Sequence, residues 1–227
     1  MGKGSQFLKG ILNLFFQPNC ALCDRPSQGS LCPACNKQLQ QSQFNNLHQL
    51  RPGKPPVLIW GSYGGILKRA IAAMKYEDCP ELARPLGHAL AEAWINSPLA
   101  ARGAIAVVPI PMHPEKQKQR GFNQAELLAK HFCELTRYSL AATGLERIRE
   151  TEALYSLSRE ERQKTLAQAM GLGKAFRRKK PSRVVLLDDI YTTGATCREA
   201  MRVLQNHGIK VYGIAAIAST RKPGETR

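Results

Sequence analysis

The chain has 227 residues, 43% of them hydrophobic, which is enough apolar material for one α/β domain with a small appendage and excludes a disordered tail. Its 33 lysine and arginine residues outnumber 17 acidic ones and give a net charge of +16, which favours nucleic acid, anionic lipid or phosphorylated small molecules as partners without distinguishing among them. No run approaches the roughly 20 apolar residues of a transmembrane segment, and no secretory signal is visible, so we predict a cytoplasmic protein.

The N-terminal residues 7–16 have an amphipathic pattern. Phe7, Leu8, Ile11, Leu12, Leu14, Phe15 and Phe16 supply one apolar face of a short helix, and Lys3 and Lys9 supply positive charge nearby. Two interpretations are open: the helix packs on its own protein, or it makes weak contact with the inner membrane surface.

Two pairs of cysteines follow, Cys20-x-x-Cys23 and Cys32-x-x-Cys35. Each pair presents two thiolates to one ion, and four such ligands complete the tetrahedron of a structural zinc site. Disulfides and thioredoxin-like redox thiols are the alternatives, but a cytoplasmic chain with a substantial core does not require disulfides. We therefore predict a zinc module over residues 1–50 and a second domain over residues 51–227.

The second domain is expected to alternate strands and helices. Buried strands are predicted from Val57, at residues 104–111, and in the segments RVVLLDD and KVYGIAAIA. Helices are predicted in ILKRAIAAMKY and ELARPLGHALAEAWI, in FNQAELLAKHFCEL with Asn123 as its N-cap, and in a segment ended by Gly208. This order predicts a mainly parallel sheet flanked by helices, with ligands at the carboxyl ends of its strands.

The segment VVLLDDIYTTGAT carries the most specific signal. Asp188 and Asp189 directly follow a buried strand, and a small, hydroxyl-rich turn leads into the next helix. Backbone N–H groups of such a turn bind a phosphate, while the carboxylates suit the hydroxyls of a sugar, so a ribose 5-phosphate would satisfy both. The turn residues are Thr192, Thr193, Gly194, Ala195 and Thr196.

This segment resembles the phosphoribosyl pyrophosphate (PRPP) motif of type I phosphoribosyltransferases. It lacks the Gly-Lys-Ser/Thr ending of a Walker loop and the GxGxxG of a Rossmann turn. The alternative is an ordinary strand-to-helix turn with solvated acids, which we disfavour because adjacent acids repel unless a ligand offsets their charge.

A second strand end, in VVPIPMHPEKQKQRGFNQA, supports the same interpretation. It places Lys116, Lys118 and Arg120 in a predicted loop before Gly121 and a helix start, where a pyrophosphate can be held. Together with the cysteine pairs and YGGILKRAIAAMKY, it resembles the ComF/GntX family, in which a cysteine-rich module precedes a phosphoribosyltransferase domain. The resemblance covers most of the chain and implies a type I phosphoribosyltransferase fold and a link to competence and DNA uptake.

One segment departs from the family pattern. It keeps the basic residues Arg147 and Arg149 but has Leu154 where a glutamine is expected and Thr165 where an asparagine is expected. In the family such a loop closes over PRPP, so the departures leave catalysis less well supported than binding. An alternative interpretation of residues 156–170 is a simple helix capped by Ser158.

The resemblance implies a division of roles. Asp188 and Asp189 would hold ribose hydroxyls and stabilise positive charge at the anomeric carbon, with Mg²⁺ bridging pyrophosphate and ribose. The leaving pyrophosphate would be stabilised by Lys116, Lys118, Arg120, Arg147 and Arg149. No protein nucleophile is required, and no acceptor pocket is recognisable.

A basic cluster precedes the strand of the acidic pair. It comprises Lys174, Arg177, Arg178, Lys179, Lys180 and Arg183, and is either a polyanion contact or a solvated loop. Three function classes therefore remain open: a phosphoribosyltransferase, a PRPP-sensing adaptor without turnover, and a protein that binds single-stranded DNA or DNA-uptake proteins.

Overall fold

The computed structural model describes residues 18–50, 53–148 and 169–221. Its main feature is a six-stranded sheet in the order β1-β2-β8-β7-β3-β4. β1 is antiparallel to β2, and the other neighbouring strands are parallel, which confirms the predicted α/β fold. The strands are β1 (His48–Gln49), β2 (Val57–Ser62), β3 (Ala106–Pro109), β4 (Ser139–Leu140), β7 (Arg183–Ile190) and β8 (Lys210–Ser219).

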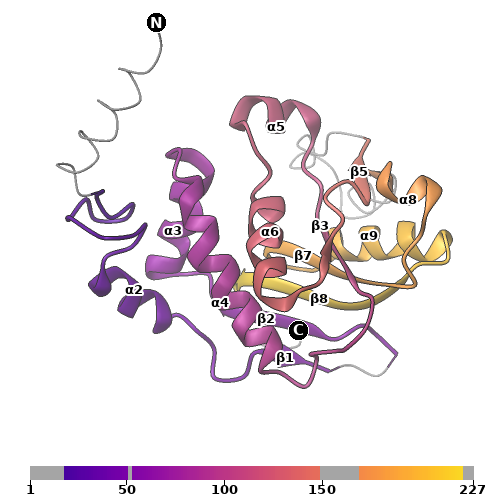
Figure 1. Ribbon diagram of the computed structural model, residues 1–227, viewed down its shortest axis with the longest axis horizontal. Helices are drawn as coiled ribbons and strands as arrows, with labels where there is room; N and C mark the ends of the chain where they lie inside the picture. Colours follow the sequence, from indigo (N-terminus) through magenta and orange to yellow (C-terminus); the bar gives the residue numbers. More distant parts are fainter. Residues whose placement is uncertain (1–17, 51–52, 149–168, 222–227) are drawn as a thin grey trace, which may run out of the picture.

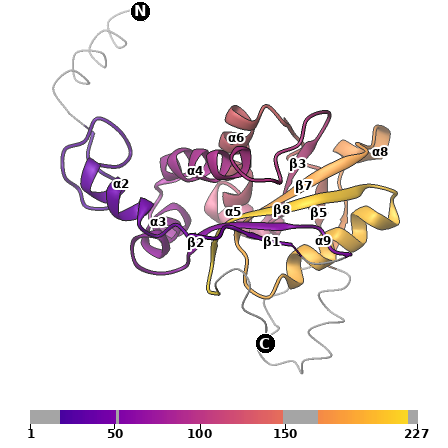
Figure 2. The same ribbon diagram turned by 90° about the horizontal axis from the view of Figure 1, so that it is seen from below.

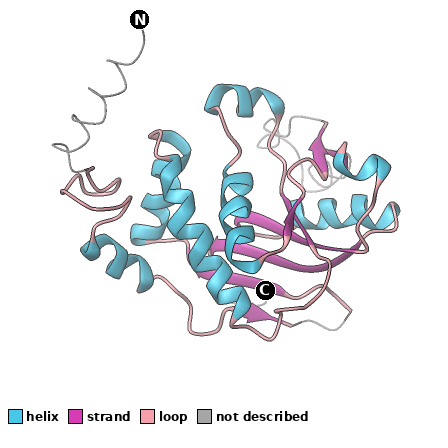
Figure 3. Cartoon of the chain, viewed as in Figure 1, coloured by secondary structure: helices cyan, strands magenta, loops and turns pink. Residues whose placement is uncertain are grey.

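Helices cover both faces of this sheet (Figure 3). Seen from below, α4 and α6 lie on one face and α9 lies on the other (Figure 2). A two-stranded antiparallel sheet, β5 (Leu145–Arg147) and β6 (Met170–Leu172), lies beside the main one. The helices are α2 (Pro33–Gln40), α3 (Gly65–Tyr76), the 3-10 helix η1 (Pro80–Leu82), α4 (Ala83–Ile95), α5 (Pro114–Arg120), α6 (Gln124–Thr136), α8 (Ala175–Arg178) and α9 (Ala195–Asn206).

The strands divide the interior into two hydrophobic cores because successive side chains point to opposite faces. Val185 and Leu187 of β7 pack with α3, α4 and α6, whereas Val184 and Leu186 pack with α9. All four are fully buried. Burial on both faces explains why β7 is a continuous apolar run that ends only where the two acids begin.

Two helix ends that were predicted from single residues agree with the structure. The side chain of Asn123 accepts a hydrogen bond from the Ala125 N–H at 3.0 Å and caps α6 as predicted. Gly208 follows α9 with a positive φ of 75°. One prediction was wrong: the residues from Pro114 to Arg120 form the helix α5, not a loop. Proline in the first turn and Gly121 in the left-handed conformation delimit it, which is the usual asymmetry of helix ends.

The cysteine-rich segment packs against the sheet's α3 side. Cys20, Leu22 and Leu39 belong to the same hydrophobic core as Trp60 and Leu67. The backbone N–H of Phe44 also donates to the Trp60 carbonyl at 3.0 Å. The division into domains near residue 50 remains a prediction, but the packing couples the two segments.

Several predicted features lie outside the described residues. These are the amphipathic segment 7–16 and the segment with Arg149, Leu154, Ser158 and Thr165. In the part of the chain that the structure describes, no helix combines the length and apolar character needed to span a bilayer.

Candidate functional site

The register of the sheet brings two distant loops to one edge. Pro109 at the end of β3 lies opposite Leu187 of β7, and the Ile110 N–H donates to the Leu187 carbonyl at 2.8 Å. The next residues are Pro111 on one strand and Asp188 on the other. The segment that leads into α5 and the acidic pair therefore meet at the carboxyl edge of the sheet, as parallel pairing requires. In Figure 1, α5 projects above the body of the molecule at this position.

A cavity of about 350 Å³ lies at this edge. Six of the predicted ligand-binding residues line it: Lys116, Arg120, Arg147, Asp188, Asp189 and Thr196. They come from α5, β5, β7 and α9. Residues not predicted as ligand contacts complete the lining, among them Lys75, Tyr76, His113, Asn123 and Gln124.

The two carboxylates are held by local backbone bonds. Asp188 accepts the N–H of Asp189, and Asp189 accepts the N–H of Ile190, each at 2.9 Å. Burial, together with the neighbouring charge of Asp189, raises the pKa of Asp188 well above its usual range. Lys75 from α3 forms an ion pair with Asp189. The site thus contains two adjacent, half-buried acids that a cation or hydroxyl donors would stabilise.

Cationic side chains also line the cavity, namely Lys75, Lys116, Arg120 and Arg147. Arg120 donates to the Gln124 side-chain oxygen at 2.7 Å, and its guanidinium carbon lies 5.2 Å from the ring centre of Tyr76. Burial lowers the pKa of Arg147, while the nearby Asp188 acts against this shift. Even so, an arginine remains charged, so the cavity combines fixed positive and negative charge.

Three buried polar atoms of the lining have no hydrogen-bond partner among the described residues. They are Nε2 of Gln124, whose residue is only 2% exposed, Nδ1 of His113, and Oδ2 of Asp189, which has only its ion pair with Lys75. Buried polar groups are normally paired, so unpaired ones in a cavity indicate a position for a polar ligand or for water. An amide N–H is a donor, which suits phosphate or hydroxyl oxygens.

Only the end of the threonine-rich turn, at Thr196, lines the cavity. Gly194 has a φ of 70°, and the ring of Tyr191 occupies the space a side chain would need there. The Thr193 hydroxyl accepts the Ala195 N–H at 3.3 Å, and Ala195 and Thr196 form the first turn of α9. Other predicted residues are described but lie outside the lining: Lys118, Gly121, Thr192, Thr193, Gly194 and Ala195.

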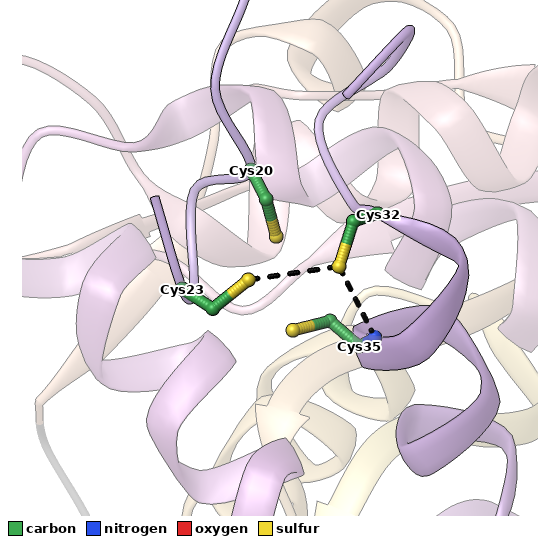
Figure 4. Close-up of side chains that lie close together, drawn as sticks. All are labelled: Cys20, Cys23, Cys32 and Cys35. Carbon is green, nitrogen blue, oxygen red and sulfur yellow. Dashed lines mark hydrogen bonds between the residues drawn. The ribbon is translucent and has the colours of Figure 1, made fainter. Parts of the chain in front are cut away.

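The four N-terminal cysteines converge on one point (Figure 4). Their sulfur atoms all lie within 4.8 Å of one another, and Sγ of Cys23 is 3.6 Å from Sγ of Cys32. Sulfur ligands of one zinc ion, each bonded at about 2.3 Å, lie roughly 3.8 Å apart in a tetrahedron. The cluster therefore has the donor set and the spacing of a structural zinc site.

The thiols also differ in acidity. Burial acts to raise the pKa of Cys20, but backbone hydrogen bonds, the strongest from Cys32, lower it to about 6. Burial and the other three thiols raise the pKa of Cys35 to about 12. Four thiolates so close together require a cation to offset their repulsion.

Comparison with known proteins agrees with this geometry. Residues 117–227 match the family described as "Phosphoribosyl transferase domain", so the fold and the match define a protein of the phosphoribosyltransferase-domain class. "Competence protein F" of Haemophilus influenzae is 25% identical over 224 residues, covering 88% of this chain and 98% of that protein. These matches support the ComF family for this chain, in which the phosphoribosyltransferase domain follows the four-cysteine cluster.

Further relatives show the same extent of similarity. "Competence protein ComFC" of Bacillus subtilis is 26% identical over 193 residues, covering 83% of this chain and 72% of that protein. "DNA utilization protein YhgH" of Escherichia coli K12 is 24% identical over 213 residues, covering 88% of this chain and 90% of that protein. Among solved structures, an adenine phosphoribosyltransferase from Leishmania donovani is 13% identical, with a TM-score of 0.39 over 82% of this chain and 68% of that one.

Sequence reasoning missed Lys75, Tyr76, His113 and Gln124 as lining residues. Lys75 and Tyr76 end a helix about 110 positions before the acidic pair, and nothing in their local pattern shows which edge of the sheet that helix reaches. Gln124 lay within a predicted helix start, next to the N-cap Asn123, and nothing in the local sequence showed that its side chain is almost completely buried.

The raised pKa of Asp188 predicts a pH-dependent penalty on folding. Below the ordinary aspartate pKa of about 3.9, the side chain is protonated in both the folded and unfolded states. Above it the unfolded chain loses the proton and the folded protein retains it, so the free energy of unfolding falls as pH rises towards the folded pKa. Asp188→Asn should abolish that fall and raise the melting temperature, by roughly 2–4 °C for each kcal/mol relieved.

Melting curves of both proteins across pH provide the measurement. The gain in melting temperature of Asp188→Asn over wild type should be absent near pH 3 and grow from about pH 4 upward. Asp78→Asn, at an exposed loop position, is the control and should show no such growth. A variant no more stable than wild type at neutral pH would contradict the assignment.

Proposed function

We propose that the cavity binds PRPP. The observation that supports this is the meeting of two adjacent carboxylates with Lys116, Arg120 and Arg147 around one cavity at the carboxyl edge of the sheet. PRPP carries a ribose with free hydroxyls between a 5-phosphate and a 1-pyrophosphate, so it needs hydrogen-bond acceptors at its centre and positive charge at its ends. A simple phosphate would leave the acids uncompensated, and a simple sugar would leave the cations uncompensated.

In this proposal the 5-phosphate lies at the turn of residues 192–196, at the positive end of α9. The carboxylates of Asp188 and Asp189 accept hydrogen bonds from the ribose hydroxyls. The pyrophosphate lies towards α5 and β5, where Lys116, Arg120 and Arg147 line the wall. Lys118, Gly121 and Arg149 belong to the same proposed group, from the family resemblance.

Magnesium would enter with the ligand. Mg²⁺ prefers carboxylate and phosphate oxygens and keeps several waters, so the acidic pair and the pyrophosphate fit its ligand preference. When bound, it would supply positive charge that neutralises the pyrophosphate. Its arrival would also offset the repulsion that raises the pKa of Asp188.

The same residues account for a transfer reaction. As the bond between the anomeric carbon and pyrophosphate lengthens, positive charge grows on the ribose and negative charge on the leaving group. Asp188 and Asp189 would stabilise the first, and the cationic wall would stabilise the second. Release of pyrophosphate from PRPP distinguishes this transferase from an adaptor that binds PRPP without turnover.

The biological setting that we propose is DNA uptake. Its support is the similarity along most of the chain to relatives named for competence and DNA utilisation. We further propose that the four cysteines hold one structural zinc ion, and that an exposed basic segment contacts DNA.

Binding of PRPP with Mg²⁺ should stabilise the protein. At a ligand concentration of ~100 Kd, the free energy of unfolding should rise by about 2.7 kcal/mol, measured as a shift of the melting temperature. The double variant Asp188→Asn, Asp189→Asn should lose most of the shift, because the ribose hydroxyls lose their hydrogen-bond acceptors and Mg²⁺ loses its carboxylate ligands. Arg147→Gln should reduce the shift because the pyrophosphate loses a cation.

Arg177→Gln is the matched control for Arg147→Gln. Arg177 is exposed, pairs with Glu146 and does not line the cavity, so its removal should leave the shift intact. A full shift in the double aspartate variant would place PRPP elsewhere and overturn the proposal.

Zinc should copurify with the protein when none is added. Cys20→Ser should lower the zinc that survives dialysis and expose the core shared by Leu22 and Leu39, because metal binding supplies folding free energy. Cys79→Ser is the control, since Cys79 lies outside the cluster. Elemental analysis is the measurement, and protein free of metal with four titratable N-terminal thiols would exclude a zinc module.

Contact with DNA has its own structural support. Lys174, Arg177, Arg178, Lys179 and Lys180 are all exposed on and around α8. Within the described residues, Arg177 has an acidic partner, Glu146, and no ion pair is present for the other four. Such a segment is suited to contact phosphates by charge rather than by sequence.

The logarithm of the binding constant for single-stranded DNA should fall linearly with the logarithm of salt concentration, with a slope of about −0.7 per contacted phosphate. Changing Arg177, Arg178, Lys179 and Lys180 together to Gln should weaken binding and flatten the slope, as measured by fluorescence anisotropy across salt. The PRPP shift should survive, since none of the four lines the cavity. An unchanged slope would show that this segment is only solvated surface.

A further inference from the structure

A second group of metal-ligating side chains lies on the helical face of the molecule. His88 of α4 and the pair His131 and Glu134 of α6 present three donor atoms within 4.8 Å of one another. Nε2 of His88 is 2.9 Å from one carboxylate oxygen of Glu134, and Nδ1 of His131 is 3.1 Å from the other. These residues line neither the cavity nor the cysteine cluster.

Helix packing places the three side chains together. A side chain carbon on Gly87 would lie 2.7 Å from Cβ of His131 and 2.8 Å from the Leu128 carbonyl, so α4 and α6 approach closely only because residue 87 is glycine. The following residue, His88, is thereby held against α6. Its ring meets that of His131 edge to face, with centroids 5.9 Å apart. His131 and Glu134 are three apart on α6 and share a face.

The spacing suits a zinc-type ion. Nitrogen and oxygen ligands bonded to zinc at about 2.0–2.2 Å lie roughly 3.3–3.6 Å apart in a tetrahedron. The observed distances of 2.9 and 3.1 Å differ from this by a few tenths of an ångström, which side-chain rotation can supply. The side chains of His88, His131 and Glu134 are 26%, 17% and 41% exposed, so an ion can reach them from solvent.

The charge state of the carboxylate fits the same role. Hydrogen bonds from His88 and His131 lower the pKa of Glu134 to about 2, so the carboxylate is ionised at neutral pH. Two imidazoles and a carboxylate are ligands that zinc, cobalt, nickel and copper ions accept.

We propose that His88, His131 and Glu134 form a second metal site, for a divalent cation of the zinc class. Three protein ligands leave at least one coordination position for water or for a donor from another molecule. In the absence of metal, Glu134 bridges the two imidazoles and ties α4 to α6 by itself. Metal binding replaces these hydrogen bonds with coordination bonds across the same helix pair.

The test is a titration of the full-length protein with Zn²⁺ or Co²⁺ after the four cysteines have been loaded with zinc. Calorimetry should show one further equivalent of metal bound per chain, and the added metal should raise the melting temperature. Cobalt in this site should show visible absorption without the thiolate-to-cobalt charge-transfer band that a cysteine site produces. That spectrum distinguishes the two sites in one experiment.

Glu134→Gln and His88→Gln should each lose the added equivalent. Glu126→Gln, which removes a carboxylate from the first turn of the same helix, should retain it. Circular dichroism and zinc retained on the cysteines would show that the variants are folded. Wild-type protein that binds no further metal, or variants that bind it as wild type does, would overturn the proposal.

Discussion

Electrostatic repulsion between Asp188 and Asp189 governs the arrangement of the site around them. Both lie within the last residues of β7, whose pairing with β8 holds their backbone in place, so the carboxylates cannot separate by moving the chain. An ion pair with Lys75 and the nearby charge of Arg147 offset part of the repulsion. Burial, together with the repulsion that remains, raises the pKa of Asp188 and makes the site receptive to a ligand that brings a cation or hydroxyl groups.

The helical face of the sheet connects this site to the metal-ligating groups. Lys75, near the end of α3, forms an ion pair with Asp189 at the cavity. Leu67, on the apolar side of the same helix, belongs to the core that includes the cysteine segment. Disruption of the cysteine cluster would therefore loosen the core next to α3. α4 and α6 complete the same face, and their close approach at Gly87 positions the histidine and glutamate group.

Much of the fold and part of the site followed from local sequence. Alternating apolar strands and helices predicted the parallel sheet, and the cysteine spacing predicted a converging cluster. The wrong assignment of α5 as a loop shows the limit of that approach: its surface carries only polar side chains, so it has no apolar periodicity, and only Pro114 and Gly121 marked its ends. Arg147 lines the cavity, whereas Lys118 on α5 is exposed and does not line it.

The sequence by itself determined those features in which neighbours along the chain are neighbours in space. These include the acids that end β7, the turn that begins α9 and the two cysteine pairs, because a strand end, a helix start and a CxxC turn are each set by a few residues. Only the tertiary structure decided that Lys75 would face Asp189, that Gln124 would lie buried with an unpaired amide, and that His88 would meet Glu134. Those juxtapositions depend on strand order and on how closely helices pack, which are properties of the whole core and leave no mark on the local pattern of any one segment.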